Sequence, residues 1–240
     1  TDVSRETEFT ASWSPAARDY GTLVVLCLGL LMAFTDLRGV RTVRVIYQMI
    51  LIGYLGLLNG DMVSQAFLAG AARHGLPWRS ALGISILSLA ALVVPLLTRR
   101  QVYCHQLCPH GAVQQLLKGR FCAPKTLPDR WHRGLSLIPV TLLGVAVLVA
   151  TLNWPVNLAA IEPFDAWLFR VAGASTICIA VLGLGLSCVY PMAYCRYGCP
   201  TGAMLGFLRR HARSDRWSRR DSVAAGLLIL SWAAFATEVW

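Results

Sequence analysis

Charged residues are scarce in this sequence. They make up 14% of its 240 residues, whereas 56% are hydrophobic. A soluble domain of ordinary composition carries about a quarter charged residues. The deficit falls on several long apolar runs, and the charges gather between them. Because a membrane-spanning helix needs about 20 apolar residues, the composition excludes an ordinary soluble domain and predicts an all-α membrane protein.

The apolar runs predict about six transmembrane helices and lack the side chains that several membrane functions need. The runs cover residues 20–36, 44–60, 80–98, 134–153, 168–190 and 222–240. No Asp, Glu, Lys or Arg lies in the middle of a run, which argues against a pump, a channel or an ion-coupled transporter. No histidine lies within a run, so a haem held between the helices would have no axial histidine.

Positive charge is distributed unevenly between the loops. The loops 36–44, 99–133 and 191–221 hold 17 of the 22 Lys and Arg residues. Cytoplasmic loops are enriched in these residues, so we expect the three loops in the cytoplasm and the N-terminus outside. The expected location is the bacterial cytoplasmic (inner) membrane. The net charge of +10 then reflects orientation and contact with anionic lipid, and no nucleic-acid partner is expected.

An internal repeat divides the chain. The pattern Y-C-x-x-x-C-P-x-G-A starts at Tyr103 and again at Tyr194, 91 residues later. We therefore expect an extracytoplasmic tail, two helical halves with one motif each and a last transmembrane helix. Their limits are 1–19, 20–133, 134–221 and 222–240. The start at Thr1 and the end within an apolar run suggest a processed chain or a segment of a longer protein.

The repeated motif has the residues of an iron–sulfur site. Four cysteine thiolates are the usual ligands of such a cluster, and the two motifs together supply Cys104, Cys108, Cys195 and Cys199. Proline after the second cysteine suits the first position of a helix. Such a helix directs free N–H groups and its positive end at the sulfurs. Glycine at the third helical position allows a close approach. One [4Fe–4S] cluster at the cytoplasmic face is therefore expected.

Other metal assignments compete with a single cluster. A four-cysteine zinc site also permits this spacing, whereas disulfides are disfavoured on a reducing face. Cys122 and Cys188 could complete a second cluster, or they could be small buried hydrophobes. His105 and His110 are expected to tune the cluster by hydrogen bonds, and Arg196 to stabilise its negative charge.

The expected outer loops carry acidic and aromatic residues with simpler interpretations. Asp61 is expected to cap a short helix that starts just after it. Glu162 and Asp165 either dock an outer partner or belong to a solvated loop. Four tryptophans are expected in the aromatic belt at the membrane interfaces, namely Trp131, Trp154, Trp167 and Trp240.

The paired Cys-x-x-x-Cys-Pro motifs between transmembrane helices resemble those of the NosR/NapH type of membrane iron–sulfur proteins. The most similar branch is the PceC-like proteins, which carry an extracytoplasmic FMN-binding domain before six spans. The resemblance covers the chain from the first span to the last. It implies electron transfer between a quinol or cytoplasmic donor and an extracytoplasmic acceptor or partner subunit. It also implies that the four motif cysteines are the ligands and that quinone is a candidate cofactor.

Two departures from this family qualify the resemblance. Its flavin-attachment motif ends in Ser/Thr-Gly-Ala-Ser/Thr, and the nearest match, Thr201-Gly202-Ala203-Met204, lacks the final hydroxyl. FMN is therefore expected only on a domain upstream of Thr1. No run of four closely spaced cysteines follows the last span, unlike in the longer members.

Two other functions remain open at this point. The protein could be a metal-handling or cofactor-maturation protein that binds metal transiently through the same thiols. It could also be a structural anchor subunit of a larger respiratory or photosynthetic complex. In the favoured interpretation, the protein is an electron carrier within an oxidoreductase system rather than a stand-alone enzyme.

Overall fold

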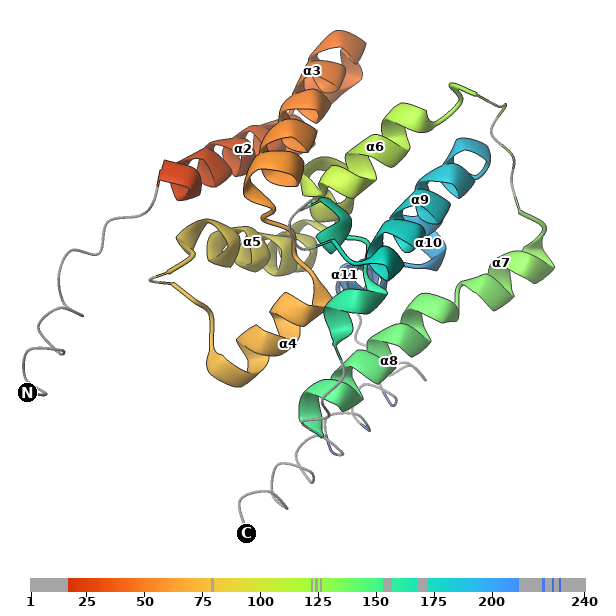
Figure 1. The fold of residues 1–240 in the computed structure, drawn as a ribbon. Helices are drawn as coiled ribbons and strands as arrows, with labels where there is room; N and C mark the ends of the chain where they lie inside the picture. Colours follow the sequence, from red (N-terminus) through yellow and green to blue (C-terminus); the bar gives the residue numbers. More distant parts are fainter. Residues whose placement is uncertain are drawn as a thin grey trace, which may run out of the picture.

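The computed structural model describes residues 17–78, 80–121, 123, 125, 127–152, 157–167 and 172–211, and the helical positions 222, 226 and 229. Helices are the only regular elements in this part of the chain, as the all-α prediction requires. They are α2 (Ala17–Phe34), α3 (Arg41–Leu51), α4 (Gln65–His74), α5 (Leu82–Thr98), α6 (Pro109–Leu117), α7 (Asp129–Leu135), α8 (Ile138–Thr151), α9 (Ala174–Val189), α10 (Ala193–Tyr197) and α11 (Pro200–His211). Short 3-10 or π-helical turns join them: η1 (Asp36–Gly39), η2 (Ile52–Asn59), η3 (Tyr103–Leu107), η4 (Leu158–Ile161) and η5 (Asp165–Trp167). In the view of Figure 1, α2 and α3 lie on one side and α7 and α8 on the other, with α6, α9, α10 and α11 between them.

Three helical stretches of the described chain are long and apolar enough to cross a membrane. They are α2, the continuous pair of α3 and η2 (Arg41–Asn59), and the pair of α7 and α8 (Asp129–Thr151). The apolar helices α5 and α9 are shorter, with 17 and 16 residues. These five stretches overlap the first five predicted spans. The predicted span 222–240 lies outside the described residues except at positions 222, 226 and 229.

The helices direct apolar side chains outward and hold polar side chains inside. On α2, the exposed residues Val24, Leu28 and Leu31 recur every three or four positions, so they share one face. The buried polar side chains include Thr22, Gln48, Ser85, Ser88, Gln114, Ser187 and Thr201. This distribution suits a protein surrounded by lipid, in which the polar contacts are made between helices.

Both cysteine motifs fold back into the helix bundle. Gly29 in the middle of α2 lies so close to Leu107 of η3 that a Cβ there would overlap its side chain. Further along the chain, Pro109 packs on Gly56 near the end of η2. The second motif packs in the same way on Gly183 in the middle of α9. Residues of both motifs therefore pack against glycines within the long apolar helices.

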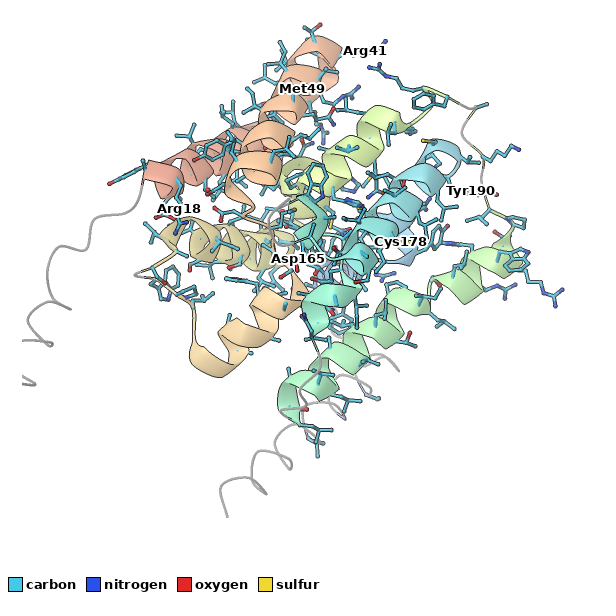
Figure 2. All side chains as sticks on the ribbon, in the orientation of Figure 1. Arg18, Arg41, Met49, Asp165, Cys178 and Tyr190 are labelled. Atoms are coloured by element: carbon cyan, nitrogen blue, oxygen red, sulfur yellow. The ribbon has the colours of Figure 1, made fainter. Side chains whose placement is uncertain are left out.

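Two loops that were expected on the outer side reach the same region. The backbone N–H of Val63 donates to the Tyr103 hydroxyl at 2.7 Å. Glu162 is only 2% exposed, and both of its carboxylate oxygens lie 2.9 Å from the N–H of Gln65. Asp165, which is labelled in Figure 2, marks this second loop. The prediction of a solvated loop is therefore wrong for Glu162.

Asp61 does not cap the helix that follows it. Its carboxylate accepts hydrogen bonds from the Thr22 hydroxyl at 2.6 Å and from the Asn59 amide. Helix α4 begins four residues later, where the Ser64 hydroxyl accepts from the N–H of Phe67 at 2.9 Å. The capping prediction is wrong, because Asp61 instead ties its loop to α2.

The buried carboxyl group predicts how stability depends on pH. Burial raises the pKa of Glu162 from 4.5 to about 8. The neutral form is therefore favoured in the folded state, and its stabilising contribution is lost as the pH rises from about 4.5 through about 8. As the pH rises over that window, the midpoint temperature of unfolding in detergent should fall by several degrees in the parent protein. This fall corresponds to a loss of a few kcal/mol in the free energy of unfolding.

The variant Glu162→Gln should remove most of this pH dependence because its side chain cannot ionise. Asp129→Asn, at an exposed position on α7, is the matched control and should keep the dependence. An unchanged slope in Glu162→Gln would show that another group is responsible.

Candidate metal centre

The two motifs share one backbone hydrogen bond, although the first forms the π-helical η3 and the second includes the short helix α10. The N–H of Cys108 donates to the carbonyl of Tyr103 at 2.8 Å, and the N–H of Cys199 donates to the carbonyl of Tyr194 at 2.8 Å. In both copies, the bond spans five residues and closes the segment that holds the two cysteines. Helices α6 and α11 begin at the prolines that follow, as the sequence predicts.

The starts of these helices direct backbone N–H groups at the sulfurs. The N–H of Gly202 donates to Cys199 Sγ at 3.2 Å. In the first motif, the backbone N–H groups of Gly111 and His110 lower the pKa of Cys108 and so partly offset the effect of burial. Hydrogen bonds to the charged form favour a thiolate, so both helix starts favour metal binding.

The glycine of each motif is needed for a close contact with the backbone. A Cβ at Gly111 would overlap the carbonyl oxygen of Cys104. A Cβ at Gly202 would lie 3.0 Å from the carbonyl oxygen of Cys195 and 3.6 Å from Cys199 Sγ. The close approach predicted for this position is therefore made to the first cysteine of the same motif.

The structure brings the four motif cysteines together. Cys104, Cys108 and Cys199 are buried, and Cys195 is half-buried. Burial raises the pKa of Cys104 to about 12 and that of Cys108 to about 11. Burial, and then the charge of the other cysteines, also raises the pKa of Cys195 and Cys199. The charge of each of the four disfavours ionisation of the other three, so the neutral thiol form is favoured in the absence of a bound cation.

Two glutamines that the sequence analysis missed connect the motifs. The side-chain amide of Gln101 donates to Cys104 Sγ at 3.3 Å and to the carbonyl of Gly202 at 3.1 Å. The fully buried Gln114 donates to Cys195 Sγ at 3.2 Å. Each glutamine therefore joins the first half of the chain to the second.

Gln114 is held in place by its carbonyl oxygen. This oxygen accepts from the Ser187 hydroxyl at 2.9 Å, and that hydroxyl also accepts from the N–H of Ala193 at 3.2 Å. The network fixes α6 against α9 and the second motif. The sequence marks Gln114 as a departure from the internal repeat, because the matching position in the second half is Leu205.

Buried polar atoms near the cysteines find no partner in the described part of the chain. They are both ring nitrogens of His110, the Tyr194 hydroxyl and the Thr201 hydroxyl. His110 and Thr201 occupy the same place in the two motifs, directly after the proline. Buried donors without acceptors are costly, and the sulfide atoms of a bound cluster would be acceptors for them. The residues present therefore fit an iron–sulfur group.

Aromatic rings enclose His110. The centroid of its ring lies 6.1 Å from that of Trp167 and 5.0 Å from that of Tyr194, both edge-to-face. Trp167 was expected in the aromatic belt, but it packs here beside the first motif. Burial lowers the pKa of His110 to about 4, so its ring is neutral near pH 7.

The remaining predicted site residues lie around the four cysteines. His105 is exposed and lines a cleft, where partial burial and then the charge of Arg209 lower its pKa. The thiol of Cys188 donates weakly to the carbonyl of Leu184 in its own helix, at 3.6 Å. Cys122 lies outside the described residues.

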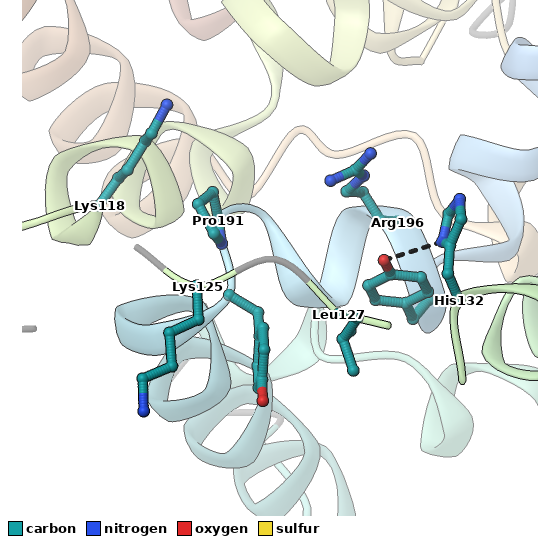
Figure 3. Close-up of a pocket in the computed structure, with 8 residues that line it drawn as sticks. Lys118, Lys125, Leu127, His132, Pro191 and Arg196 are labelled. Atoms are coloured by element: carbon teal, nitrogen blue, oxygen red, sulfur yellow. Dashed lines mark hydrogen bonds between the residues drawn. The ribbon is translucent and has the colours of Figure 1, made fainter. Parts of the chain in front are cut away.

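Arg196 faces a different pocket. Its guanidinium lies 5.9 Å from the centre of the Tyr197 ring, whose hydroxyl is 3.0 Å from His132 Nδ1 (Figure 3). The pocket has a volume of about 330 Å³ and is also lined by Lys118 and Lys125. These contacts place the Arg196 side chain on the surface of its motif.

The cysteines are not arranged as a site for one metal ion. Among the described residues, no group of three or more His, Cys, Asp or Glu side chains could hold a single ion.

Comparisons with known proteins point to the same chemistry. Residues 80–128 and 172–221 match the family described as 4Fe-4S binding domain, and each stretch contains one motif. Protein NirI of Paracoccus denitrificans is 31% identical over 183 residues, which are 68% of this chain and 26% of NirI. Regulatory protein NosR of Pseudomonas aeruginosa is 26% identical over 200 residues, covering 75% of this chain and 27% of NosR. NosR of Stutzerimonas stutzeri is 25% identical over 204 residues, which are 77% of this chain and 27% of that protein.

The chain spans about a quarter of the length of these relatives. No solved structure matches it. The helices, the cysteines and the matched domain define a membrane iron–sulfur protein of the electron-transport class. Within that class, the chain is a NosR/NapH-type iron–sulfur protein.

The contact of Gly111 with the Cys104 carbonyl predicts the effect of adding one methyl group. Gly111→Ala should lose most of its bound iron and acid-labile sulfide, because the backbone of the motif must shift to admit the Cβ. The expected loss of stability is about 1–3 kcal/mol, as for overpacking elsewhere. Gly144→Ala, on α8 with open space around its Cβ, is the control and should retain the cluster. Equal iron content in the two variants would contradict the prediction.

Proposed function

We propose that this chain is a membrane electron-transfer protein that relays single electrons through one [4Fe–4S] cluster held by Cys104, Cys108, Cys195 and Cys199. The observation that carries the proposal is the gathering of these four cysteines, from two motifs, around a buried centre with unpartnered polar atoms. The protein makes and breaks no substrate bond itself. The cluster supplies the one-electron chemistry, and the chain supplies its environment.

The surroundings of the cysteines suit a cluster that must accept and release electrons. Hydrogen bonds from Gln101, Gln114 and the N–H of Gly202 reach three of the four sulfurs. Donors to the sulfurs stabilise the more negative, reduced cluster and raise its reduction potential. The apolar core formed by Leu107 and Phe164 excludes water from the same region.

The motifs enter the bundle from the side that we assign to the cytoplasm. This assignment rests on the Lys and Arg residues of loops 36–44, 99–133 and 191–221. The loops from the opposite face contact Tyr103 through Val63 and His110 through Trp167. We therefore place the cluster between the two faces rather than at the cytoplasmic surface. An acceptor on the outer side of the membrane then lies closer to the cluster than the full ~30 Å thickness of the hydrocarbon core.

The redox partners follow from the resemblance and from this location. We propose a quinol or cytoplasmic donor and an extracytoplasmic acceptor or partner subunit in the bacterial inner membrane. FMN belongs, on this proposal, to a domain outside this chain, and quinone is a candidate cofactor without an assigned residue. The burial of three motif cysteines argues against the metal-handling alternative, because metal exchange requires accessible thiols.

Metal analysis tests the proposal directly. Anaerobically prepared protein should contain about four irons and four sulfides per chain, with an EPR signal after reduction by dithionite. Cys199→Ser should lose the signal and most of the iron because one ligand is gone. Cys178→Ser, at an exposed position of α9, is the control and should keep both.

Three other results would change the assignment. Zinc, or the absence of acid-labile sulfide, would overturn the electron-transfer proposal. About eight irons would make Cys122 and Cys188 candidate ligands of a second cluster. Unchanged electron flux in Cys199→Ser, with the protein correctly inserted, would favour the structural anchor.

The contact between Gln114 and Cys195 predicts a change in reduction potential. Gln114→Leu removes a hydrogen bond to a ligand sulfur, so the potential should fall by about 50 mV, equivalent to roughly 1 kcal/mol. Gln115→Leu is the control, because Gln115 bonds to Gln48 and to the His105 carbonyl but to no sulfur. An EPR-monitored redox titration measures both, and equal potentials would contradict the role of Gln114.

A further inference from the structure

A strongly basic cleft opens beside the first cysteine motif. It has a volume of about 630 Å³. Five arginines line it: Arg38, Arg44, Arg99, Arg100 and Arg209. No acidic side chain is among its lining residues. The cleft therefore presents positive charge to a ligand of opposite sign.

The arginines come from separate elements that the fold brings together. Arg38 lies in η1, Arg44 in α3, and Arg209 in α11, while Arg99 and Arg100 follow α5. Arg100 is also anchored, because its guanidinium donates to the Ala33 carbonyl at 2.8 Å. The enrichment of positive charge on one membrane face explains the number of arginines but not their convergence on one concavity. A cleft lined by charges of one sign focuses the electric field and attracts charged partners.

The cleft ends at a proposed cluster ligand. Gln101 lines the cleft, and its amide donates to Cys104 Sγ at 3.3 Å. His105, the neighbour of Cys104 in the chain, lines the cleft as well. A partner bound in the cleft is therefore separated from the cluster site by a single side chain, that of Gln101. Binding of a lipid headgroup would not require this proximity, whereas electron exchange with a soluble protein does.

We propose that this cleft docks an acidic one-electron carrier protein whose carboxylates pair with the five arginines. The inference rests on the proposed function and adds the class of the partner and its entry point. In the transfer step, the reduced carrier loses one electron and the oxidised cluster gains it. No bond is formed or broken, and no proton is required.

The test uses the full chain in nanodiscs of neutral lipid with a small acidic ferredoxin as the probe. Stopped-flow absorbance measures the second-order rate of cluster reduction at increasing ionic strength. Arg44→Glu/Arg99→Glu reverses two exposed charges of the cleft without removing the anchored Arg100. Arg130→Glu/Arg133→Glu makes the same change in charge on exposed positions of α7, away from the cleft, and is the matched control.

The proposal predicts a rate at least about tenfold lower in the cleft variant at low ionic strength, with a smaller difference at high salt. The α7 variant should react at nearly the parent rate. Equal rates for the two variants would overturn the docking site. Loss of binding to anionic vesicles in the cleft variant, with an unchanged ferredoxin rate, would assign the cleft to lipid instead.

Photoreduction by a deazaflavin separates failure of docking from failure of the proposed function. All three proteins should show the same iron content and the same reduced-cluster EPR signal under this treatment. If they do, a difference in ferredoxin rate between the variants, or the lack of one, reflects the cleft alone. If the parent protein holds no reducible cluster, the proposed function fails, and the docking inference fails with it.

Discussion

The placement of four thiols in a helical interior constrains the rest of this structure. Burial raises the pKa of Cys104 and Cys108 above the ordinary value, and mutual repulsion opposes the ionisation of all four. An iron–sulfur group reverses this balance because its irons stabilise the thiolates. The features around the cysteines share this purpose. The helix starts and the two glutamines direct N–H donors at the sulfurs, and the motif glycines let each turn close tightly.

A membrane setting makes such a site possible and also limits its backbone. Irregular backbone within the membrane is tolerated only where protein covers it. Here both turns are closed by a bond from the second cysteine to the preceding tyrosine carbonyl, and the surrounding helices cover them. The same packing brings the loops containing Val63 and Trp167 to the motif. Polar contacts are thereby gathered inside the bundle, and the apolar faces remain for lipid.

The two motifs share the hydrogen bond from the second cysteine to the tyrosine carbonyl but differ in their neighbours. Gln101 and Gln114 both belong to the first half, and the matching positions in the second half carry Met192 and Leu205. The basic cleft likewise adjoins the first motif, next to Cys104. The repeat therefore supplies four similar candidate ligands, whereas the departures from it make the surroundings of the two motifs unequal. On the docking proposal, this inequality would give an electron carrier a preferred side for docking.

The sequence by itself determined the helical class, the first five apolar stretches, the helix starts at Pro109 and Pro200 and the four candidate ligands. These follow from local patterns: apolar length, proline position and cysteine spacing. Only the tertiary structure decided that Glu162 is buried, that Asp61 binds Thr22, that Trp167 packs on His110 and that distant arginines share one cleft. Loop composition cannot reveal such contacts, because a polar residue in a loop has the same local pattern whether the loop faces water or folds back into the bundle. That choice depends on helices far away in the sequence.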